Sequence, residues 1–326
     1  MDLSIIIVSF NTKELLKRCL LSVFKTVNGV TFEVIVVDNA SQDGSPEMVK
    51  ESFPGVRLIE NDTNAGFAKA NNLAINAARG RFLFLLNSDT VLQASPRTVL
   101  DYLDSERNVG LLGCRIVYGN SALQRSAWRF PTLFQEWYYF SFDIIRTFIP
   151  ALSKLRYRGI DYNVKTETDC VSGCSLFIRK TLLDLIGVLD ERFFMYYEDT
   201  EYCYRARMKT QYRTVYYPHY QVVHYHGMSG NRLKATLRSF NSAQYYFFKT
   251  KGPRTASLFI ATCRASWQCN LALLTVLGLV VRSRKVAEKI ETFRKLLAFT
   301  QKFSSKKRMG DHAEAETFLE SVCKSS

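Results

Sequence analysis

The sequence predicts an α/β fold in which helices flank a mainly parallel sheet. Two observations support this expectation: short apolar runs recur over residues 3–114, and amphipathic stretches separate them. The apolar runs are Leu3–Ser9, Glu33–Asp38, Val56–Glu60, Arg81–Leu86 and Val109–Cys114, of which the first two are rich in Val and Ile. Strand and helix signals that alternate in this way are typical of βαβ units, whose strands lie parallel.

The stretches between these runs open with residues that favour a helix start. The expected starts are Asn11 with Glu14 three residues later, Ser45 before Pro46, Asn64 before an apolar stretch, and Ser95 before Pro96. Ser and Asn side chains accept hydrogen bonds from the first amides of a helix, and Pro fits its first turn. The local signals therefore agree with the alternation.

Later segments predict the rest of the domain. We expect a loop and strand in CVSGCSLFIR, a short helix in KTLLDLIG, an amphipathic helix in EDTEYCYRARMK and a strand in RTVYYP. The α/β domain should therefore span residues 1–230, followed by a helical extension over 231–326. From about residue 125 to 160, aromatic residues stand among basic ones without a strict period. This segment predicts a mobile or surface-lying insertion.

The C-terminal extension combines apolar and basic stretches. The segment from Ser257 to Val281 is apolar but interrupted by Arg264, Gln268 and Asn270, and its uninterrupted part, Leu271–Val281, has 11 residues. A spanning helix needs about 20, so we expect one helix or two short ones in a membrane interface. Residues 282–308 then carry ten Lys or Arg and two Glu, which suits anionic lipid. A core helix followed by a solvated charged tail is the alternative.

Composition narrows the possible partners. The chain has 326 residues, 47% of them hydrophobic, and a net charge of +14, which predicts an anionic partner: nucleic acid, an anionic lipid surface or a phosphorylated substrate. No helix-turn-helix or stacking motif supports nucleic acid. The N-terminus lacks the basic and apolar regions of a signal peptide, so we expect a cytoplasmic protein. The eight cysteines have no zinc spacing and are interpreted as reduced thiols.

Two predicted strands end in acidic residues. Asp38 and Asp43 follow the second apolar run, and Asn87 and Asp89 follow the fourth. Because carboxyl ends of parallel strands line the ligand crevice of α/β folds, Asp38 and Asp43 suit a base edge and a ribose, and Asn87 with Asp89 suits a divalent cation. An Asx turn at the first site and a helix cap at the second are the alternatives.

Two more sites lie nearer the end of the domain. Glu198 and Asp199 open a predicted helix, where one of them can serve as a general base or where both simply cap the helix. His224 and His226 alternate, so on a strand both face one side. They can bind a metal or a phosphate, or form a surface pair of histidines.

Taken together, these motifs resemble glycosyltransferase family 2, and within it the bacterial rhamnosyltransferase-like branch that builds cell-surface polysaccharides. The resemblance covers about residues 3–230. It is carried by IIIVSFN, VVDNASQDGS, NAGFAKANN, LLNSDT, VSGCSLFIRK, LDERFFMYYEDTEYCYR and VVHYHGMS, in that order.

The resemblance implies a Rossmann-like fold of the glycosyltransferase A type, inversion at the anomeric carbon and a Mg²⁺ or Mn²⁺ ion. It places Ser9 and Asn11 in the nucleotide pocket, Asp38 on the base, Asp89 on the metal, and Asn64, Gly66, Phe67 and Asn71 on the donor-sugar side. Asp199 would be the general base with Glu198 beside it, and His224 or His226 would contact metal or diphosphate. The chain departs from the family pattern in having NSD in place of two aspartates, and EDTE in place of EDxD.

The resemblance also implies a substrate class. We expect dTDP-L-rhamnose as donor, with UDP-sugars as the alternative. The aromatic segment and the apolar-then-basic tail, and not the resemblance, predict a lipid-linked saccharide as acceptor at the inner face of the cytoplasmic membrane. A dehydrogenase on such a sheet would need a glycine-rich turn after its first strand, and VSFNTKE has none. A basic nucleic-acid- or membrane-binding protein on an inactive transferase fold is the alternative of another class.

Overall fold

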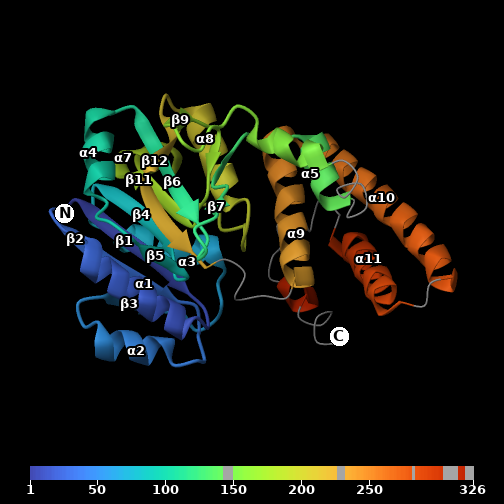
Figure 1. Cartoon of the computed structure of the whole chain (residues 1–326), viewed down its shortest axis with the longest axis horizontal. Coiled ribbons are helices and arrows are strands. Elements are labelled where there is room, and N and C mark those ends of the chain that lie inside the picture. The colour runs from blue at the N-terminus through green and yellow to red at the C-terminus, as the bar shows by residue number, and fades with distance from the viewer. Residues whose placement is uncertain (142–149, 226–231, 281–282, 304–314, 320–326) are drawn as a thin grey trace. The chain divides into compact units, whose positions relative to one another are not determined.

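The computed structural model describes residues 1–141, 150–225, 232–280, 283–303 and 315–319 (Figure 1). The chain divides into two compact units. The sheet unit comprises Met1–Phe130, Tyr157–Phe194 and Glu198–Ser229, and the helical unit comprises Pro131–Arg156, Met195–Tyr197 and Gly230–Ser326. The segment expected as an insertion thus contributes residues 131–156 to the helical unit.

A mixed, mainly parallel sheet forms the centre of the sheet unit. Its main path has the order β3-β2-β1-β4-β11-β6-β12-β5. These strands are β1 (Leu3–Ser9), β2 (Phe32–Asp38), β3 (Arg57–Glu60), β4 (Phe82–Asn87), β5 (Thr90–Leu92), β6 (Val109–Val117), β11 (Ser175–Arg179) and β12 (Arg213–His224). Strands β1 to β4 are parallel to one another, as β6 is to β12, whereas β11 and β5 run antiparallel to their neighbours. The predicted α/β fold is confirmed.

Four short strands complete the unit. β7 (Leu123–Gln124) pairs with β6, and β9 (Thr166–Glu167) pairs with β12. β8 (Ala127–Trp128) and β10 (Cys170–Val171) form a separate two-stranded sheet.

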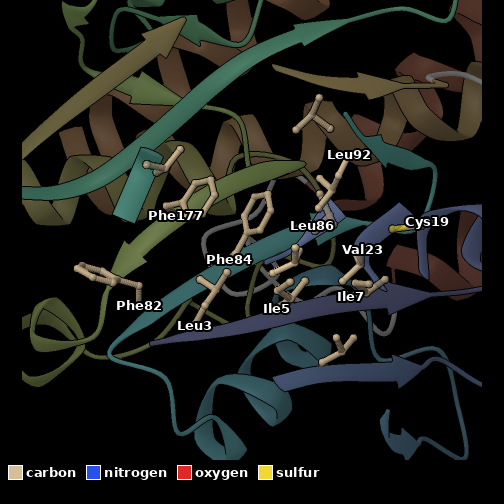
Figure 2. Packing of buried hydrophobic residues seen from close by; sticks show 14 of the residues in the cluster. Leu3, Ile5, Ile7, Cys19, Val23, Phe82, Phe84, Leu86, Leu92 and Phe177 are labelled. Carbon is tan, nitrogen blue, oxygen red and sulfur yellow. The ribbon is translucent and has the colours of Figure 1, made fainter. Parts of the chain in front are cut away.

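The helices of the sheet unit pack on the sheet in two buried clusters. Successive side chains of a strand point to opposite faces, and each cluster contains the side chains of one face. Leu3, Ile5 and Ile7 of β1 join one cluster and Ile6 joins the other, as the period of two in a strand requires. Figure 2 shows Leu3, Ile5 and Ile7 of the first cluster beside Phe84 and Leu86 of β4. The ring of Phe84 stacks on Phe177 with centroids 3.9 Å apart. The first cluster includes residues of α1 (Lys13–Thr26), α2 (Ser45–Ser52) and α4 (Arg97–Ser105); the second includes α3 (Phe67–Ala77), α7 (Lys180–Ile186) and α8 (Glu198–Lys209).

All four helix starts differ by one or two residues from the expected capping residues. The residues before α1, α2, α3 and α4 are Thr12, Gly44, Gly66 and Pro96. Asn11 instead accepts a hydrogen bond from the Gln42 amide at 2.8 Å, and Asn64 accepts one from the Gly66 amide at 3.0 Å. Both side chains therefore hydrogen-bond to backbone amides of loops in place of capping a helix, an alternative that Asn commonly adopts near helix starts.

The helical unit contains α5 (Leu133–Ser141), the 3₁₀ segment η1 (Pro150–Tyr157), α9 (Arg232–Lys251), α10 (Pro253–Val280) and α11 (Arg284–Phe303). Aromatic side chains fill its core. Phe240 of α9 lies 5.3 Å from Phe140 of α5 and 4.9 Å from Trp267 of α10, measured between ring centroids. Trp267 also donates its indole N–H to the Phe140 carbonyl at 2.8 Å. The aromatic segment therefore packs inside this unit, and the expectation of a mobile or surface-lying insertion is wrong for α5.

The apolar C-terminal segment forms one continuous helix, α10, in place of two short ones (Figure 1). Its buried residues include Phe259, Cys263 and Trp267, whereas Leu258, Leu273 and Val276 are exposed. Among the described residues, none of the helices combines the length and the hydropathy needed to cross a membrane.

Candidate active site

The carboxyl ends of β1, β2 and β4 lie in register and bring the predicted polar residues together. Ser9 pairs with Asp38, and Val8 pairs with Asn87. Asp38 is buried; its Oδ2 accepts a hydrogen bond from the Ser41 amide at 2.8 Å, while its Oδ1 has no partner. A buried carboxylate oxygen without a donor is costly, so this atom suits a donor group supplied by a ligand such as a base edge.

Asp43 uses both carboxylate oxygens within the protein. Oδ2 accepts a hydrogen bond from the Lys13 amide at 2.8 Å, and Oδ1 accepts from the amide and hydroxyl of Ser45. Burial by itself would raise the pKa of Asp43, but the hydrogen bonds from Ser45 and Lys13 outweigh it and lower the pKa. Asp43 thus fixes the starts of α1 and α2, which is the turn geometry that the sequence left open as the alternative.

A chain of hydroxyl groups links the first and fourth strand ends. Ser9 Oγ lies 3.0 Å from Thr12 Oγ1, which lies 3.0 Å from Ser88 Oγ. Neither Thr12 nor Ser88 was expected from the sequence as a site residue, although each is adjacent in the chain to a predicted site residue, Asn11 and Asp89 respectively. Hydroxyls of this kind can donate to ribose or phosphate oxygens.

Asp89 meets His224 where β4 ends. Asp89 Oδ1 and His224 Nε2 are 3.1 Å apart, and His224 is buried. The Tyr225 amide donates to the Asp89 carbonyl at 2.9 Å, and β12 pairs with β5 so that His224 faces Thr90. On its other side, His224 Nδ1 lies 2.9 Å from Gln124 Oε1 of β7. If Nδ1 donates to Gln124, Nε2 presents a lone pair toward Asp89.

This pair fits a divalent cation. Two neighbouring ligands of an octahedral ion, each at about 2.1 Å, lie about 3 Å from one another, so the oxygen and nitrogen have a suitable spacing. The side chain of Asn87 is half-buried beside them. Within the described part of the chain, no three His, Cys, Asp or Glu side chains gather as a candidate metal cluster. His226 lies outside the described residues, and Mg²⁺ commonly takes its remaining ligands from substrate phosphates and water.

Asp199 lies at the start of α8 and is held by backbone donors. Its Oδ2 accepts a hydrogen bond from the Gly173 amide at 2.9 Å, and its Oδ1 accepts from the Thr200 amide at 2.6 Å. Glu198 next to it is buried, and its Oε2 has no hydrogen-bonding partner. Burial, and then the nearby charge of Asp199, raise the pKa of Glu198 well above its usual range. The two acids therefore differ in their surroundings: burial favours the protonated form of Glu198, whereas backbone donors orient the carboxylate of Asp199.

The loop predicted to line the donor sugar, residues 64–67, reaches the same region. Gly66 has a φ of 82°, and the Phe67 amide donates to the Phe194 carbonyl at 2.6 Å. The Asn39 side chain donates to the Gly66 carbonyl at 3.2 Å. Asn71 is buried and bonds back to the Phe67 carbonyl at 2.8 Å, so it fixes the start of α3. A Cβ built on Gly173 would lie 3.4 Å from Asp199 and 3.5 Å from Phe67, which places the loop beside the acid.

Unusual backbone conformations flank these residues. Five non-glycine residues of the described chain have positive φ, and four of them are Asn11, Ala40, Tyr196 and Tyr197. Asn11 and Ala40 follow β1 and β2, and the two tyrosines directly precede Glu198. Such conformations cost on the order of 1–3 kcal/mol each and cluster at functional sites.

Solved structures define the fold class. A mannosyltransferase from Pyrobaculum calidifontis in complex with GDP-Man and Mn²⁺ has a TM-score of 0.54 at 17% identity, covering 92% of this chain and 86% of that one. GalNAc-T7 with UDP, GalNAc and Mn²⁺ has a TM-score of 0.50 at 16% identity, covering 76% and 50%. The predicted A-type glycosyltransferase fold is confirmed.

Sequence comparisons define the family. The family model described as Glycosyl transferase family 2 matches residues 4–186, and the chain belongs to this family. A low-salt glycan biosynthesis hexosyltransferase of Haloferax volcanii is 28% identical over 211 residues, covering 63% of this chain and 62% of that protein. An N-acetylglucosaminyl-diphospho-decaprenol L-rhamnosyltransferase of Mycobacterium tuberculosis is 26% identical over 266 residues, covering 77% and 83%. The predicted family is thereby confirmed.

Proposed function

We propose that this family 2 glycosyltransferase is metal-dependent and inverting, and that it moves a sugar from a nucleotide diphosphate to a hydroxyl of a lipid-linked saccharide. The proposed donor is dTDP-L-rhamnose, with UDP-sugars as the second group to test. The proposed place is the inner face of the cytoplasmic membrane. The rhamnosyltransferase relative, whose name includes a decaprenol-linked saccharide, supports both the donor and the acceptor.

One observation carries the proposal: residues 173 and 174 connect the candidate base to the candidate metal residues. The Gly173 amide donates to Asp199, and the carbonyl of the next residue, Cys174, accepts from the Asn87 amide at 3.0 Å. Asn87 is the last residue of β4 and stands two residues before Asp89. An acid for deprotonating the acceptor thus stands near a pair of side chains suited to the diphosphate end of the donor.

The proposed reaction is a single displacement. Asp199 accepts the proton of the acceptor hydroxyl while its oxygen forms a bond to the anomeric carbon from the face opposite the diphosphate. The bond between that carbon and the diphosphate oxygen breaks, and the configuration inverts. Asp89 and His224 would hold Mg²⁺ or Mn²⁺, which when bound neutralises negative charge on the diphosphate. Asp38 would orient the base.

The test is nucleoside diphosphate release from a panel of dTDP- and UDP-sugars, with Mg²⁺, with Mn²⁺ and with EDTA. For Asp199→Asn we expect release to fall by about 10²–10⁴-fold with nucleotide affinity unchanged, since the proposed proton acceptor is removed while the residues proposed to bind the nucleotide are untouched. The matched control is Asp184→Asn, at an exposed acid of α7, which should behave as the wild type. Unaltered release from Asp199→Asn would refute the base assignment, and no release or binding with any donor would refute the function.

A further inference from the structure

The positive charge of the chain is concentrated in one continuous segment. Residues 202–287 contain 14 Lys or Arg and no Asp or Glu, which equals the net charge of +14 of the whole chain. The remainder is therefore neutral overall. Most of this acid-free segment belongs to the helical unit, from α9 through α10 to the first turn of α11. Arg205, Arg207 and Arg213 pair with acids of the sheet unit. Arg238 and Arg284 pair with acids of the helical unit. The excess of positive charge nevertheless favours an anionic partner for this part of the chain.

Helix α10 has two different faces. One face packs in the aromatic core of the helical unit through Phe259, Trp267 and Leu274. The other face is exposed and apolar: Leu273, Val276 and Leu279 are 57%, 62% and 81% exposed. Between Arg254 and Arg282 the single charged residue is the half-buried Arg264. The exposed face is therefore long, apolar and without acidic residues.

Basic residues stand at both ends of this face. Arg254 is exposed in the first turn of α10, and Lys285 is exposed at the start of α11. Apolar side chains flanked by cations match the interface of an anionic bilayer, where acyl chains meet the apolar face and phosphates meet the cations.

We propose that the exposed face of α10, with Leu258, Leu273, Val276 and Leu279 as its apolar residues, docks in the plane of an anionic phospholipid bilayer. A second copy of the chain is less suited, because two such faces would bring like charges at Arg254 and Lys285 together. Nucleic acid is less suited, because the face offers aliphatic side chains where a phosphate backbone needs cations and donors. This proposal names the surface that would contact the membrane. It rests on the proposed function in one respect: docking would bring the enzyme to a lipid-linked acceptor.

The test is co-sedimentation of the full chain with vesicles of phosphatidylglycerol mixed with phosphatidylcholine, and with vesicles of phosphatidylcholine alone. We expect binding to the anionic vesicles and a partition coefficient that falls on the order of tenfold or more in the double variant Leu273→Glu/Val276→Glu. Both positions are exposed, so the fold should persist, and circular dichroism checks this. The matched control is Leu185→Glu on α7 of the sheet unit, at a leucine that is 61% exposed.

A second variant tests the charge. Arg254→Gln/Lys285→Gln should weaken binding to anionic vesicles and reduce its salt dependence, while leaving the low binding to phosphatidylcholine unchanged. Equal binding of the wild type and Leu273→Glu/Val276→Glu would overturn the proposal. The proposal would also be overturned if light scattering showed that the wild type is a dimer and that the variant is a monomer with unchanged vesicle binding. The exposed face of α10 would then join two copies of the chain.

Release of nucleoside diphosphate without vesicles separates this proposal from the proposed function. The α10 variants should retain that release, since none of the substituted residues belongs to the candidate site. Lost vesicle binding with intact release supports the docking face. A chain that binds vesicles through α10 but releases no diphosphate from any donor would refute the function and leave the docking face standing.

Discussion

The two units of the molecule use polar residues differently. In the sheet unit, acids and hydroxyls gather at strand ends, and backbone amides donate to Asp38, Asp43 and Asp199. In the helical unit, Glu136 is fully buried, accepts a hydrogen bond from the Tyr197 hydroxyl and pairs with Arg156 at 3.3 Å. The first arrangement orients carboxylates through backbone donors and leaves Asp38 Oδ1 without a partner, whereas the second neutralises a carboxylate inside a core.

This difference suggests that the residues for the reaction belong to the sheet unit and that the helical unit contributes stability and a surface. The sheet unit carries the candidate base and metal residues, while the helical unit carries aromatic packing and an exposed apolar face. Variants in the first unit should therefore change ligand binding or turnover, and variants in the second should change stability or location. Substitutions in the two units therefore test that separation.

Asp89→Asn should produce the largest loss outside the base itself. The substitution removes the charged member of the Asp89–His224 pair, so we expect Mn²⁺-dependent turnover to fall by about 10²–10³-fold and Mn²⁺ affinity to fall with it. Donor hydrolysis and Mn²⁺ titration by electron paramagnetic resonance measure the two effects. Asp184→Asn again serves as control, and full Mn²⁺ affinity in Asp89→Asn would show that the metal residues lie elsewhere.

Gly66→Ala should damage the loop of residues 64–67. An added Cβ would lie 2.5 Å from the Phe194 carbonyl oxygen, at a φ of 82° that alanine rarely adopts. We expect the free energy of unfolding to fall by about 2–3 kcal/mol, measured by urea denaturation. Gly55→Ala is the matched control because nothing lies within 4 Å of the added Cβ. Equal stability of the two variants would contradict the close approach of this loop to Phe194.

Gln124→Leu should weaken metal binding without touching the metal. Gln124 Oε1 lies 2.9 Å from His224 Nδ1 and can select the tautomer that turns the Nε2 lone pair toward Asp89. We expect Mn²⁺ affinity to fall by about 10–100-fold, the usual effect of losing such a partner. Gln93→Leu removes a different glutamine contact, to Gln221 at 2.6 Å, and should leave affinity unchanged. Identical titrations for both variants would exclude the orienting role.

Tyr197→Phe should have the smallest effect on chemistry. It removes the hydroxyl that donates to the buried Glu136, and burial with the adjacent carboxylate raises the pKa of Tyr197 well above its usual range, so this hydroxyl stays a donor. We expect a loss of about 1–2 kcal/mol in the free energy of unfolding, with Mn²⁺ affinity retained. Tyr118→Phe, at an exposed tyrosine, is the control. A loss of Mn²⁺ affinity in Tyr197→Phe would break the separation of the units.

Much of the sheet unit was predictable because its signals are local. The run at Leu3–Ser9 was expected with the bounds that β1 has, and the helix at EDTEYCYRARMK matches α8. Asp38 and Asn87 could be placed together because parallel strands end at one edge. Gln124 could not, since its contact to His224 spans 100 positions and comes from a strand of two residues. Likewise, no local period reveals that α5 packs on α9 and α10, because aromatic packing of distant helices leaves no regular spacing.

The way the chain alternates between its units limits how the protein can be recombined. The helical unit includes Pro131–Arg156 and the three residues Met195–Tyr197, each bounded on both sides by segments of the sheet unit. Truncation of the chain near residue 230 would therefore remove most of the helical unit. It would leave two pieces of that unit behind in the remaining chain, one of them directly before Glu198 and Asp199. Replacing this unit with that of a relative would require new chain junctions at each of its segments. A recombination at one position therefore cannot exchange the whole aromatic core independently of the acids of the sheet unit.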